Sequence, residues 1–387
     1  MTDMDFDLPE ETLALKEMVR EFAAKEITPH AAQWSENEEF PTQVFTKLGE
    51  LGLMGMLVPE EYGGAGSDMV TYVAVMEELG AADQSVASSW NAHSTIATLP
   101  LLAYGTEEQK HRWLAPLAAG EAIGAFGLTE PEAGSDAAGI ATTARRVDGG
   151  WVINGTKMFI TNAGTDISQG VTILAVTGRE EGGRKRYATF YVPTGTPGYT
   201  VGHKLKKLGW HAMDTRELVF DGCLVPDDHL IGEEGGGLRQ FLSVLDKGRI
   251  SVAALGLSLA KAALGLAVKH ATERHQFGRP LADFQAVGHK IADMGTELEA
   301  ARCLVYRAAW LADQGRPHST ASAMAKLYAS EVANRAASQA VQIHGGYGYV
   351  RESEISRFYA DAKILEIGEG TNEIQRNVIA RALVSEA

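Results

Sequence analysis

The spacing of apolar residues changes twice along this chain of 387 residues, and these changes limit the folds that it can adopt. Residues 1–124 carry apolar side chains at helical spacing, residues 125–235 carry short β-type runs separated by Pro, Gly and Asp, and residues 236–387 return to helical spacing. Helices, then strands, then helices, with no βαβ alternation, argue against a doubly wound parallel sheet. We therefore expect an α+β protein with an N-terminal helical domain, a middle antiparallel β-barrel or sandwich domain, and a C-terminal four-helix bundle.

Several helix boundaries can be read from capping and breaking residues. Apolar residues recur at helical spacing after Pro9, and Pro41 opens a second helix. Thr106 and Gln109 form a capping-box pattern for a short helix. In the last domain we expect long helices over 250–274, over 283–313, and from Ser319 or Thr320 to Gly345-Gly346.

The clearest strand signal lies in the middle domain. Asn154-Gly155 separates Trp151–Ile153 from Thr156–Ile160, and Asn-Gly between two β-type runs predicts a two-residue hairpin. Further strands are expected over 171–176, 187–192 and 217–225.

Charge and cysteine content argue against several classes of function. The formal net charge of −15 and the pI near 5.2 disfavour a nucleic-acid groove or an anionic membrane surface as the main partner. Cys223 and Cys303 are the only cysteines, and they form neither a disulfide framework nor a metal-ligand spacing. We therefore expect no metal site and a reducing compartment.

No segment reads as a targeting or membrane-spanning sequence. Met1–Glu10 is acidic and lacks a basic region followed by an apolar run. The richest apolar run, Ile250–Val268, contains Ser251, Ser258 and Lys261, so we expect a buried helix and no stretch that could span a membrane. The glycine-rich phosphate loops of Rossmann and P-loop proteins are missing, so a nucleotide phosphate would be held in another way.

One carboxylate near the C-terminus stands in an unusual setting. Glu369 lies between Gly368 and Gly370, which remove side-chain bulk and permit backbone conformations closed to other residues. Thr371 or Asn372 can cap the helix that follows. Most Glu-Gly turns at helix starts are solvated caps, but this setting would also let a substrate approach a catalytic base.

Four stretches carry recognisable motifs. They are FGLTEPEAGSD at 126–136, KMFITN at 157–162, ERHQFG at 273–278, and QIHGG at 342–346 together with Glu369-Gly370-Thr371. Each motif is weak alone, but all four occur in order and with suitable spacing. Together they resemble the acyl-CoA dehydrogenase family over essentially the whole chain, most closely its short-chain and short/branched-chain members. The resemblance implies FAD as cofactor, a coenzyme A thioester as substrate, and α,β-dehydrogenation to the trans-2-enoyl-CoA.

The resemblance also implies roles for individual residues. Glu369 is the expected base for the α-proton, flavin N5 accepts the β-hydride, and the Glu369 backbone N–H donates to the thioester oxygen. The residues expected at the substrate are Ser135, Asp246, Arg249 and Gly370. The residues expected at FAD are Phe126, Leu128, Thr129, Ser135, Phe159, Thr161, Arg274, Gln276, Phe277, Gln285, Gln342, Ile343, Gly345, Gly346, Thr371 and Glu373. Taken singly, such residues also fit structural roles, as turns, core aromatics, helix-end arginines and helix-stopping glycines.

The chain departs from the family pattern at three positions. Phe159 stands where the family usually has Trp, which leaves a smaller stacking surface. Gly248 occupies the position from which some branched-chain members supply the base, so Glu369 is the only base at either position. Gly368 replaces the Tyr of many straight-chain members, and we expect this to admit branched or bulkier short acyl groups. The residues expected to line the acyl end are Asn91, His93, Ser94 and Thr95.

Other interpretations stay open at this point. The substrate could instead be a medium-chain or unusual acyl-CoA, or the chain could be a non-catalytic flavin-binding scaffold. An acyl-CoA oxidase would carry an extra C-terminal domain and a nucleic-acid-binding relative a basic extension, whereas this chain ends at Ala387. The family further implies an electron-transfer flavoprotein as partner and a homotetramer. The missing targeting signal, with many Ala and Gly residues, fits a bacterial cytoplasmic enzyme.

Overall fold

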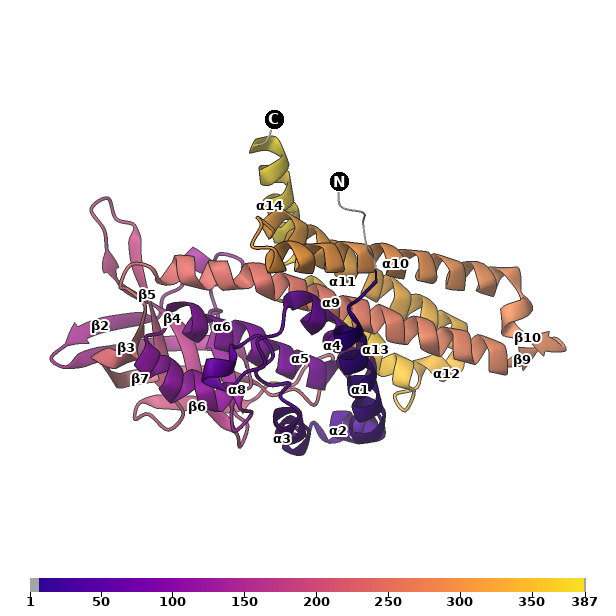
Figure 1. Cartoon of the computed structure of the whole chain (residues 1–387), viewed down its shortest axis with the longest axis horizontal. Helices are drawn as coiled ribbons and strands as arrows, with labels where there is room; N and C mark the ends of the chain where they lie inside the picture. The colour runs from indigo at the N-terminus through magenta and orange to yellow at the C-terminus, as the bar shows by residue number, and fades with distance from the viewer. Residues whose placement is uncertain (1–6, 386–387) are drawn as a thin grey trace.

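The computed structural model describes residues 7–385, arranged in three parts along one long axis (Figure 1). The β domain lies at one end, the N-terminal helices lie near the middle, and the long C-terminal helices extend to the other end (Figure 1). Residues 1–6, which belong to the Met1–Glu10 segment considered for targeting, lie outside the described residues. The α+β class and the order of helices, strands and helices are confirmed.

The N-terminal part is helical, and its helix starts follow the expected caps. Pro41 directly precedes α3, as expected. The capping box is confirmed, because Thr106 Oγ1 accepts from Gln109 N and the Gln109 side chain accepts from Thr106 N. The elements are α1 (Glu10–Glu26), α2 (Ala31–Asn37), α3 (Thr42–Glu50), α4 (Met69–Ala82), α5 (Gln84–Ala92), the π-helical turn η2 (His93–Ala97), α6 (Thr98–Tyr104), α7 (Glu107–Gln109), the π-helical turn η3 (Lys110–Leu114) and α8 (Ala115–Ala118). Of these, α5 is buried along its whole length and so lies inside the protein.

The β domain is built on one eight-stranded sheet, with strand order β6-β7-β3-β2-β4-β5-β8 and β1 paired to β4. The strands are β1 (Ile123–Gly127), β2 (Thr143–Val147), β3 (Gly150–Thr161), β4 (Ser168–Arg179), β5 (Lys185–Pro193), β6 (Tyr199–Lys204), β7 (Thr215–Pro226) and β8 (Leu230–Ile231). The strands expected over 171–176, 187–192 and 217–225 are confirmed as parts of β4, β5 and β7. Most strand pairs are antiparallel, but β1 and β2 each pair with β4 in parallel. Parallel pairing is possible because neither β1 nor β2 is joined to β4 by a hairpin.

The hairpin predicted at Asn154-Gly155 is wrong. β3 continues through both residues, and the Asn154 side chain accepts a hydrogen bond from Gly222 N of β7 at 2.8 Å. The pairing register with β7 shifts between Ile153 and Gly155. Gly155 has φ 148°, and an added Cβ there would lie 2.4 Å from Thr142 Oγ1. The hairpin instead joins β2 to β3 at Asp148-Gly149, where Gly149 has φ 74°.

The C-terminal part is a helical bundle dominated by three long helices. Its helices are α9 (Gly237–Glu273), α10 (Gln285–Asp313), α11 (Ser319–His344), α12 (Gly346–Tyr349), α13 (Glu354–Ala362) and α14 (Asn372–Ser385). The expected second and third long helices match α10 and α11, whereas α9 begins well before residue 250. The short strands β9 (His275–Gln276) and β10 (Arg279–Pro280) join α9 to α10 at the end of the molecule far from the sheet (Figure 1).

The expectation that no segment is long and apolar enough to span a membrane needs correction. Within residues 7–385, α9 alone meets that criterion by length and composition, with a mean hydropathy of 1.8 in its most apolar window. However, 72% of that window is buried inside the protein, as in the core helices of soluble proteins. The composition of α9 is therefore weak evidence for a membrane span.

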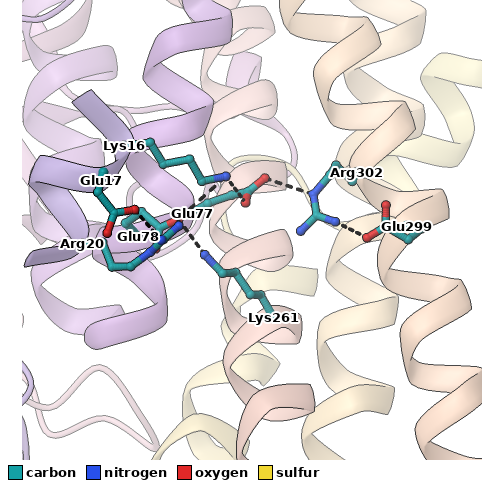
Figure 2. A network of polar contacts seen from close by, with 8 residues as sticks. All are labelled: Lys16, Glu17, Arg20, Glu77, Glu78, Lys261, Glu299 and Arg302. Atoms are coloured by element: carbon teal, nitrogen blue, oxygen red, sulfur yellow. Dashed lines mark hydrogen bonds and ion pairs between the residues drawn. The ribbon is translucent and has the colours of Figure 1, made fainter. Parts of the chain in front are cut away.

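A charge network joins the N-terminal helices to the bundle (Figure 2). Glu77 of α4 is buried and pairs with Lys16 of α1 at 2.9 Å and with Arg302 of α10 at 3.3 Å. The adjacent Glu78, also buried, pairs with Lys261 of α9 at 2.7 Å. The network therefore fixes α4 against three other helices.

Candidate functional site

A short loop between the 3-10 turn η7 (Lys363–Glu366) and α14 presents Glu369. Gly368 N donates to Ile364 O at 2.8 Å, which closes the preceding turn. Glu369 then has φ 50° and Gly370 has φ 93°. Positive φ suits glycine but is unfavourable for a residue with a side chain, such as Glu369. Of the two caps considered from the sequence, Thr371 is the one used, since its Oγ1 accepts from the amide three residues further on. Glu369 therefore lies on strained backbone at a helix N-terminus.

Lys326 of α11 holds this loop in place, and sequence reasoning missed it. Its Nζ donates to Gly370 O at 2.9 Å and to Asn372 Oδ1 at 3.0 Å. Gln375 Nε2 also donates to Gly370 O, at 2.8 Å. Lys326 is fully buried, so these acceptors compensate for the water that its ammonium group lost. The only signal in the sequence is one lysine in an Ala-rich helix, which is equally typical of a helix surface.

The Glu369 carboxylate is only partly satisfied. Its Oε2 is buried and has no hydrogen-bond partner among the described residues, while Asn91 Nδ2 of α5 lies 3.5 Å from Oε1. An added Cβ at Gly248 of α9 would lie 2.2 Å from Oε2, so a side chain there would displace the carboxylate. Burial raises the pKa of Glu369 to about 7, although Lys326, Arg249 and Asn91 favour the ionised form. A buried carboxylate with a free oxygen and a pKa near neutrality is suited to take up a proton.

Among the residues expected at the substrate, Gly370 lies in the Glu369 loop, and Arg249 is close enough for its charge to favour the ionised form of Glu369. Arg249 is buried on α9, and its Nη1 donates to Asp246 Oδ1 at 2.5 Å. Arg249 Nε is buried without a partner among the described residues. Ser135 is exposed in the loop before the 3-10 turn η4 (Ala137–Gly139). Positive charge is therefore available next to Glu369, and a hydroxyl is available from the β domain.

Strand β3 presents Phe159 in a strained conformation. Its φ is 63°, it lies at a β-bulge, and its side chain is 64% exposed. Thr161 follows as a half-buried residue, and Asn162 Nδ2 donates to Ser89 O of α5 at 2.9 Å. That bond fixes the end of β3 against the helix that reaches Glu369. An exposed aromatic ring held by backbone strain offers a stacking surface for a planar ligand.

A buried ion pair supports the segment that follows β1. Lys157 Nζ donates to Glu130 Oε1 at 2.8 Å and to Leu128 O at 3.2 Å, and Met158 N donates to Thr129 O at 2.8 Å. Burial lowers the pKa of Lys157 to about 8, against the effect of the Glu130 carboxylate. The carbonyl oxygens of Leu128 and Thr129 already accept hydrogen bonds within the protein. A ligand would therefore interact with the hydrogen-bond donors of this segment, such as the Thr129 hydroxyl.

The remaining residues expected near this site differ in exposure: the Phe126 ring is buried, whereas Glu373 is exposed. The Phe126 ring is buried against Phe241, with ring centroids 4.3 Å apart, so only the Phe126 backbone is left to approach a ligand. Thr371 and Glu373 lie at the start of α14, and Glu373 is exposed. The backbone N–H of Glu373 and the Thr371 hydroxyl hold the pKa of Glu373 below its usual range. Within residues 7–385, no group of three or more His, Cys, Asp or Glu is placed to hold a metal ion.

The structure corrects the residues expected at the acyl end. His93 is fully buried, and its Nδ1 accepts from Gly124 N at 3.1 Å; burial lowers the pKa of His93 to about 4. Thr95 Oγ1 donates to the backbone of its own helix. Of the four expected residues, Asn91 does face Glu369. Ile96, which was not expected, lies 3.4 Å from an added Cβ at Gly248. A π-helical turn brings residues i and i+5 to one side, and the sequence carries no signal for it.

A second group of expected residues lies at the far end of the bundle. Arg274, Gln276 and Phe277 follow the end of α9, and Phe277 is 93% exposed with φ 52°. The Arg274 guanidinium lies 5.6 Å from the Tyr347 ring, next to the end of α11. From Gly248 to Arg274, α9 spans roughly 40 Å at 1.5 Å per residue, too far for one small ligand to reach both. The other members of this group are Gln285, Gln342, Ile343, Gly345 and Gly346, at the start of α10 and the end of α11.

Family models match three successive segments of the chain. They are the acyl-CoA dehydrogenase N-terminal domain over residues 9–121, the middle domain over 125–223 and the C-terminal domain over 235–384. A probable acyl-CoA dehydrogenase of Bacillus subtilis is 48% identical over 381 residues, which cover 98% of this chain and 100% of the relative.

Two solved structures have the same fold. The butyryl-CoA dehydrogenase of Megasphaera elsdenii matches with a TM-score of 0.95 at 40% identity, over 98% of this chain and 100% of that chain. An acyl-CoA dehydrogenase of Bacillus anthracis, solved in complex with FAD, matches with a TM-score of 0.93 at 33% identity, over 98% of this chain and 69% of that chain.

Proposed function

This chain belongs to the acyl-CoA dehydrogenase family, and from that membership we propose that it dehydrogenates short acyl-CoA thioesters with Glu369 as the base. It is an FAD-dependent oxidoreductase. One observation supports the assignment of the base above all others: Oε2 of the Glu369 carboxylate is buried and has no partner among the described residues. Such a group lowers the stability of the fold, and a role in catalysis accounts for its presence.

The residues around Glu369 fit FAD. The exposed and strained Phe159 would stack on its ring system, and the hydroxyls of Thr129 and Thr161 would donate to its polar edge. Thr371 and Glu373 would contact it from the start of α14. When bound, FAD accepts the hydride that leaves the β-carbon of the substrate.

Glu369 takes the α-proton of the acyl group in this proposal. The α-proton of a thioester is far too weakly acidic for an ordinary carboxylate, so the site must raise the basicity of Glu369 and stabilise the enolate. Burial meets the first need, since it raises the pKa of Glu369 to about 7. For the second need, the Glu369 backbone N–H donates to the thioester oxygen, and the nearby Arg249 adds positive charge.

A short acyl group is the substrate that we propose. The relative from Megasphaera elsdenii is named for butyryl-CoA. The glycine at 368 leaves space that a larger residue would fill, because an added Cβ there would lie 3.5 Å from Ile364 O, an ordinary contact. We therefore keep the hypothesis that branched short acyl groups are accepted as well.

The far-end group favours an assembly of several chains. Arg274, Gln276 and Phe277 are exposed yet too distant to serve the Glu369 of their own chain. We propose a homotetramer in which they complete the FAD site of a neighbouring subunit, with the Arg274 guanidinium on the pyrophosphate. An electron-transfer flavoprotein as acceptor and a cytoplasmic location complete the proposal.

Anaerobic bleaching of the bound flavin by a panel of acyl-CoAs tests this function. We expect rapid bleaching by butyryl-CoA and by isobutyryl-, 2-methylbutyryl- or isovaleryl-CoA in the wild-type protein. Glu369→Gln should slow bleaching at least roughly 10²–10⁴-fold while FAD stays bound, because general-base catalysis contributes about that much. Near-normal bleaching in Glu369→Gln would exclude this residue as the base.

The panel also separates the remaining alternatives. A clear preference for butyryl-CoA over all three branched substrates would contradict the hypothesis based on Gly368. Bound FAD that no short acyl-CoA bleaches would favour a medium-chain or unusual thioester, or a scaffold without turnover.

A further inference from the structure

A polar pair from α4 and α5 lies behind Glu369. Tyr72 is fully buried, its ring stacks on Trp90 with centroids 4.6 Å apart, and its Oη donates to Asn91 Oδ1 at 2.9 Å. Asn91 is also buried, and its backbone carbonyl accepts from Thr95 Oγ1 at 2.7 Å. Both the backbone and the side chain of Asn91 are therefore held in place before any substrate arrives.

The hydrogen bond from Tyr72 decides which end of the Asn91 amide faces Glu369. Because the hydroxyl donates to Oδ1, the Nδ2 group is turned toward the carboxylate and lies 3.5 Å from Glu369 Oε1. This contact is long for a hydrogen bond, as contacts in ligand-free sites often are before they tighten around substrate. The amide thus approaches one carboxylate oxygen and leaves the other, Oε2, without a partner among the described residues.

Other groups that face Glu369 are charged or titratable. Lys326 of α11 and Arg249 of α9 both favour the ionised carboxylate, and Arg249 is itself paired with Asp246. Burial, followed by the Glu369 charge, raises the pKa of Tyr72 well above its usual range, so its hydroxyl stays protonated and remains a donor. Lys326 also binds the loop backbone, so replacing it would disturb more than the carboxylate. Asn91 is neutral, and among the described residues its side chain bonds to Tyr72 and Glu369 rather than to that loop backbone.

We propose that Asn91 is a positioning residue for the base. Held by Tyr72, its amide donates to Oε1 of Glu369, favours the ionised carboxylate and leaves Oε2 free for the substrate. This inference rests on the proposed role of Glu369 as the base.

Deuterium incorporation at carbon α measures this step without hydride transfer. The probe is a 3-thia acyl-CoA, in which sulfur replaces carbon β, so that the α-proton can exchange with D₂O but no hydride can leave. Exchange requires the carboxylate form of Glu369, so its rate falls as the pH drops below the Glu369 pKa. In the holoenzyme, Asn91→Leu removes the donor and should raise the midpoint of this pH profile by about half a unit to one unit. Exchange at pH 6 should then be several-fold slower, while exchange at pH 9 should change little.

Tyr72→Phe provides a second variant that keeps the stacked ring and removes only the hydroxyl. Its midpoint should shift in the same direction by a smaller amount, because the amide is no longer held in one orientation. If Asn91→Leu fails to fold, Tyr72→Phe alone is sufficient to test the inference. The matched control is Tyr104→Phe, which removes a hydroxyl hydrogen-bonded to Ser243 on the exposed surface and should leave the midpoint unchanged.

The outcomes separate this inference from the proposed function. Exchange that persists in Glu369→Gln would overturn the base itself, and this inference with it. Exchange lost in Glu369→Gln, but with a wild-type midpoint in both Asn91→Leu and Tyr72→Phe, would overturn the role of Asn91 alone. An equal loss of exchange at every pH would also overturn it, since it would indicate disturbed packing rather than a lost donor.

Discussion

At the scale of single residues, the groups proposed for catalysis oppose the stability of the fold. Glu369, Phe159 and Phe277 all have positive φ, which disfavours non-glycine residues. The folded state also holds the proton of Glu369 more tightly than an unfolded chain would, because burial raises its pKa to about 7. The fold is therefore penalised as the pH rises from the ordinary range of a glutamate to above 7, where the carboxylate must be ionised while buried.

Glu369→Gln should accordingly stabilise the protein at the expense of activity. The neutral amide mimics the protonated carboxyl, so we expect the free energy of unfolding to rise by about 1–3 kcal/mol at pH 8. The gain should shrink toward zero as the pH falls below about 4, where the wild-type carboxyl is mostly protonated in both states. Thermal unfolding of the holoenzyme across this pH range measures the effect. Glu352→Gln, at an exposed residue before α13, is the control and should show no such gain. A gain in Glu369→Gln that is independent of pH would contradict the argument.

Residues of the site differ in how far the sequence reveals them. Glu369 can be found because glycines on both sides are unusual around a carboxylate, and Arg249 because the family resemblance implies it at the substrate. Lys326 gives no such signal, and Asn91 was expected at the acyl end of the substrate rather than at Glu369. Their roles depend on which face of a helix points inward, and on a π-helical turn that leaves no local signature.

At the scale of elements, turn residues indicate one hairpin correctly and another wrongly. Both Asn154-Gly155 and Asp148-Gly149 satisfy the rule for a two-residue hairpin, and only the second forms one. Asn154-Gly155 forms no turn because its tertiary contacts keep it within β3. Thr142 packs closely against Gly155, and the Asn154 side chain accepts a hydrogen bond from β7. Helix boundaries were more predictable, because Pro41 and the Thr106 capping box act within a few residues of themselves.

Two glycines of α9 should respond in opposite ways to alanine. At Gly256 an added Cβ would lie 2.9 Å from Ala329 O, so Gly256→Ala should push α11 away and lower the free energy of unfolding by about 1–3 kcal/mol. At Gly265 nothing lies within 4 Å, so Gly265→Ala should raise it by about 0.5–1 kcal/mol through backbone entropy. Denaturant unfolding of both variants measures the two changes in the free energy of unfolding. Shifts of the same sign would show that helix propensity, rather than the contact with α11, dominates.

At the scale of the whole molecule, charge holds the N-terminal part against the bundle (Figure 2). Although burial opposes ionisation of Glu77, Lys16 and Arg302 bring its pKa below the usual range of a glutamate. The stabilisation from a lowered carboxylate pKa is present at neutral pH and is lost as the pH falls through the folded-state value. Acid should therefore loosen α4 from α1 and α10.

Glu77→Gln tests this attachment. It leaves Lys16 and Arg302 with one fewer partner, so we expect a loss of about 1–3 kcal/mol at pH 7. The difference from wild type should be much smaller at an acid pH below the folded-state pKa of Glu77. Glu17→Gln is a matched control from the same network, because the Glu17–Arg20 pair is exposed and should contribute at most about 1 kcal/mol. Unfolding curves at both pH values decide the matter. Equal losses in the two variants would indicate a general charge effect rather than a buried one.

The proposed assembly predicts complementation between two inactive chains. Glu369→Gln keeps its far-end group, whereas Arg274→Ala combined with Phe277→Ala keeps its base but should bind FAD weakly. If the far-end residues serve a neighbouring subunit, chains of both kinds expressed together should regain some acyl-CoA-dependent flavin bleaching. Absence of any recovery in hybrids isolated by two affinity tags would argue that each chain holds FAD alone.

The length of α9 also bears on how this protein can change during evolution. The helix carries Gly248 against the Glu369 carboxylate near one end and leads directly to Arg274 at the other. One inserted or deleted residue between them would turn the far end by about 100° relative to the near end and move it by about 1.5 Å. Substitutions along α9 can be absorbed one side chain at a time, whereas a change in its length alters both ends at once. We therefore expect the number of residues between these two positions to tolerate far less variation than their identity.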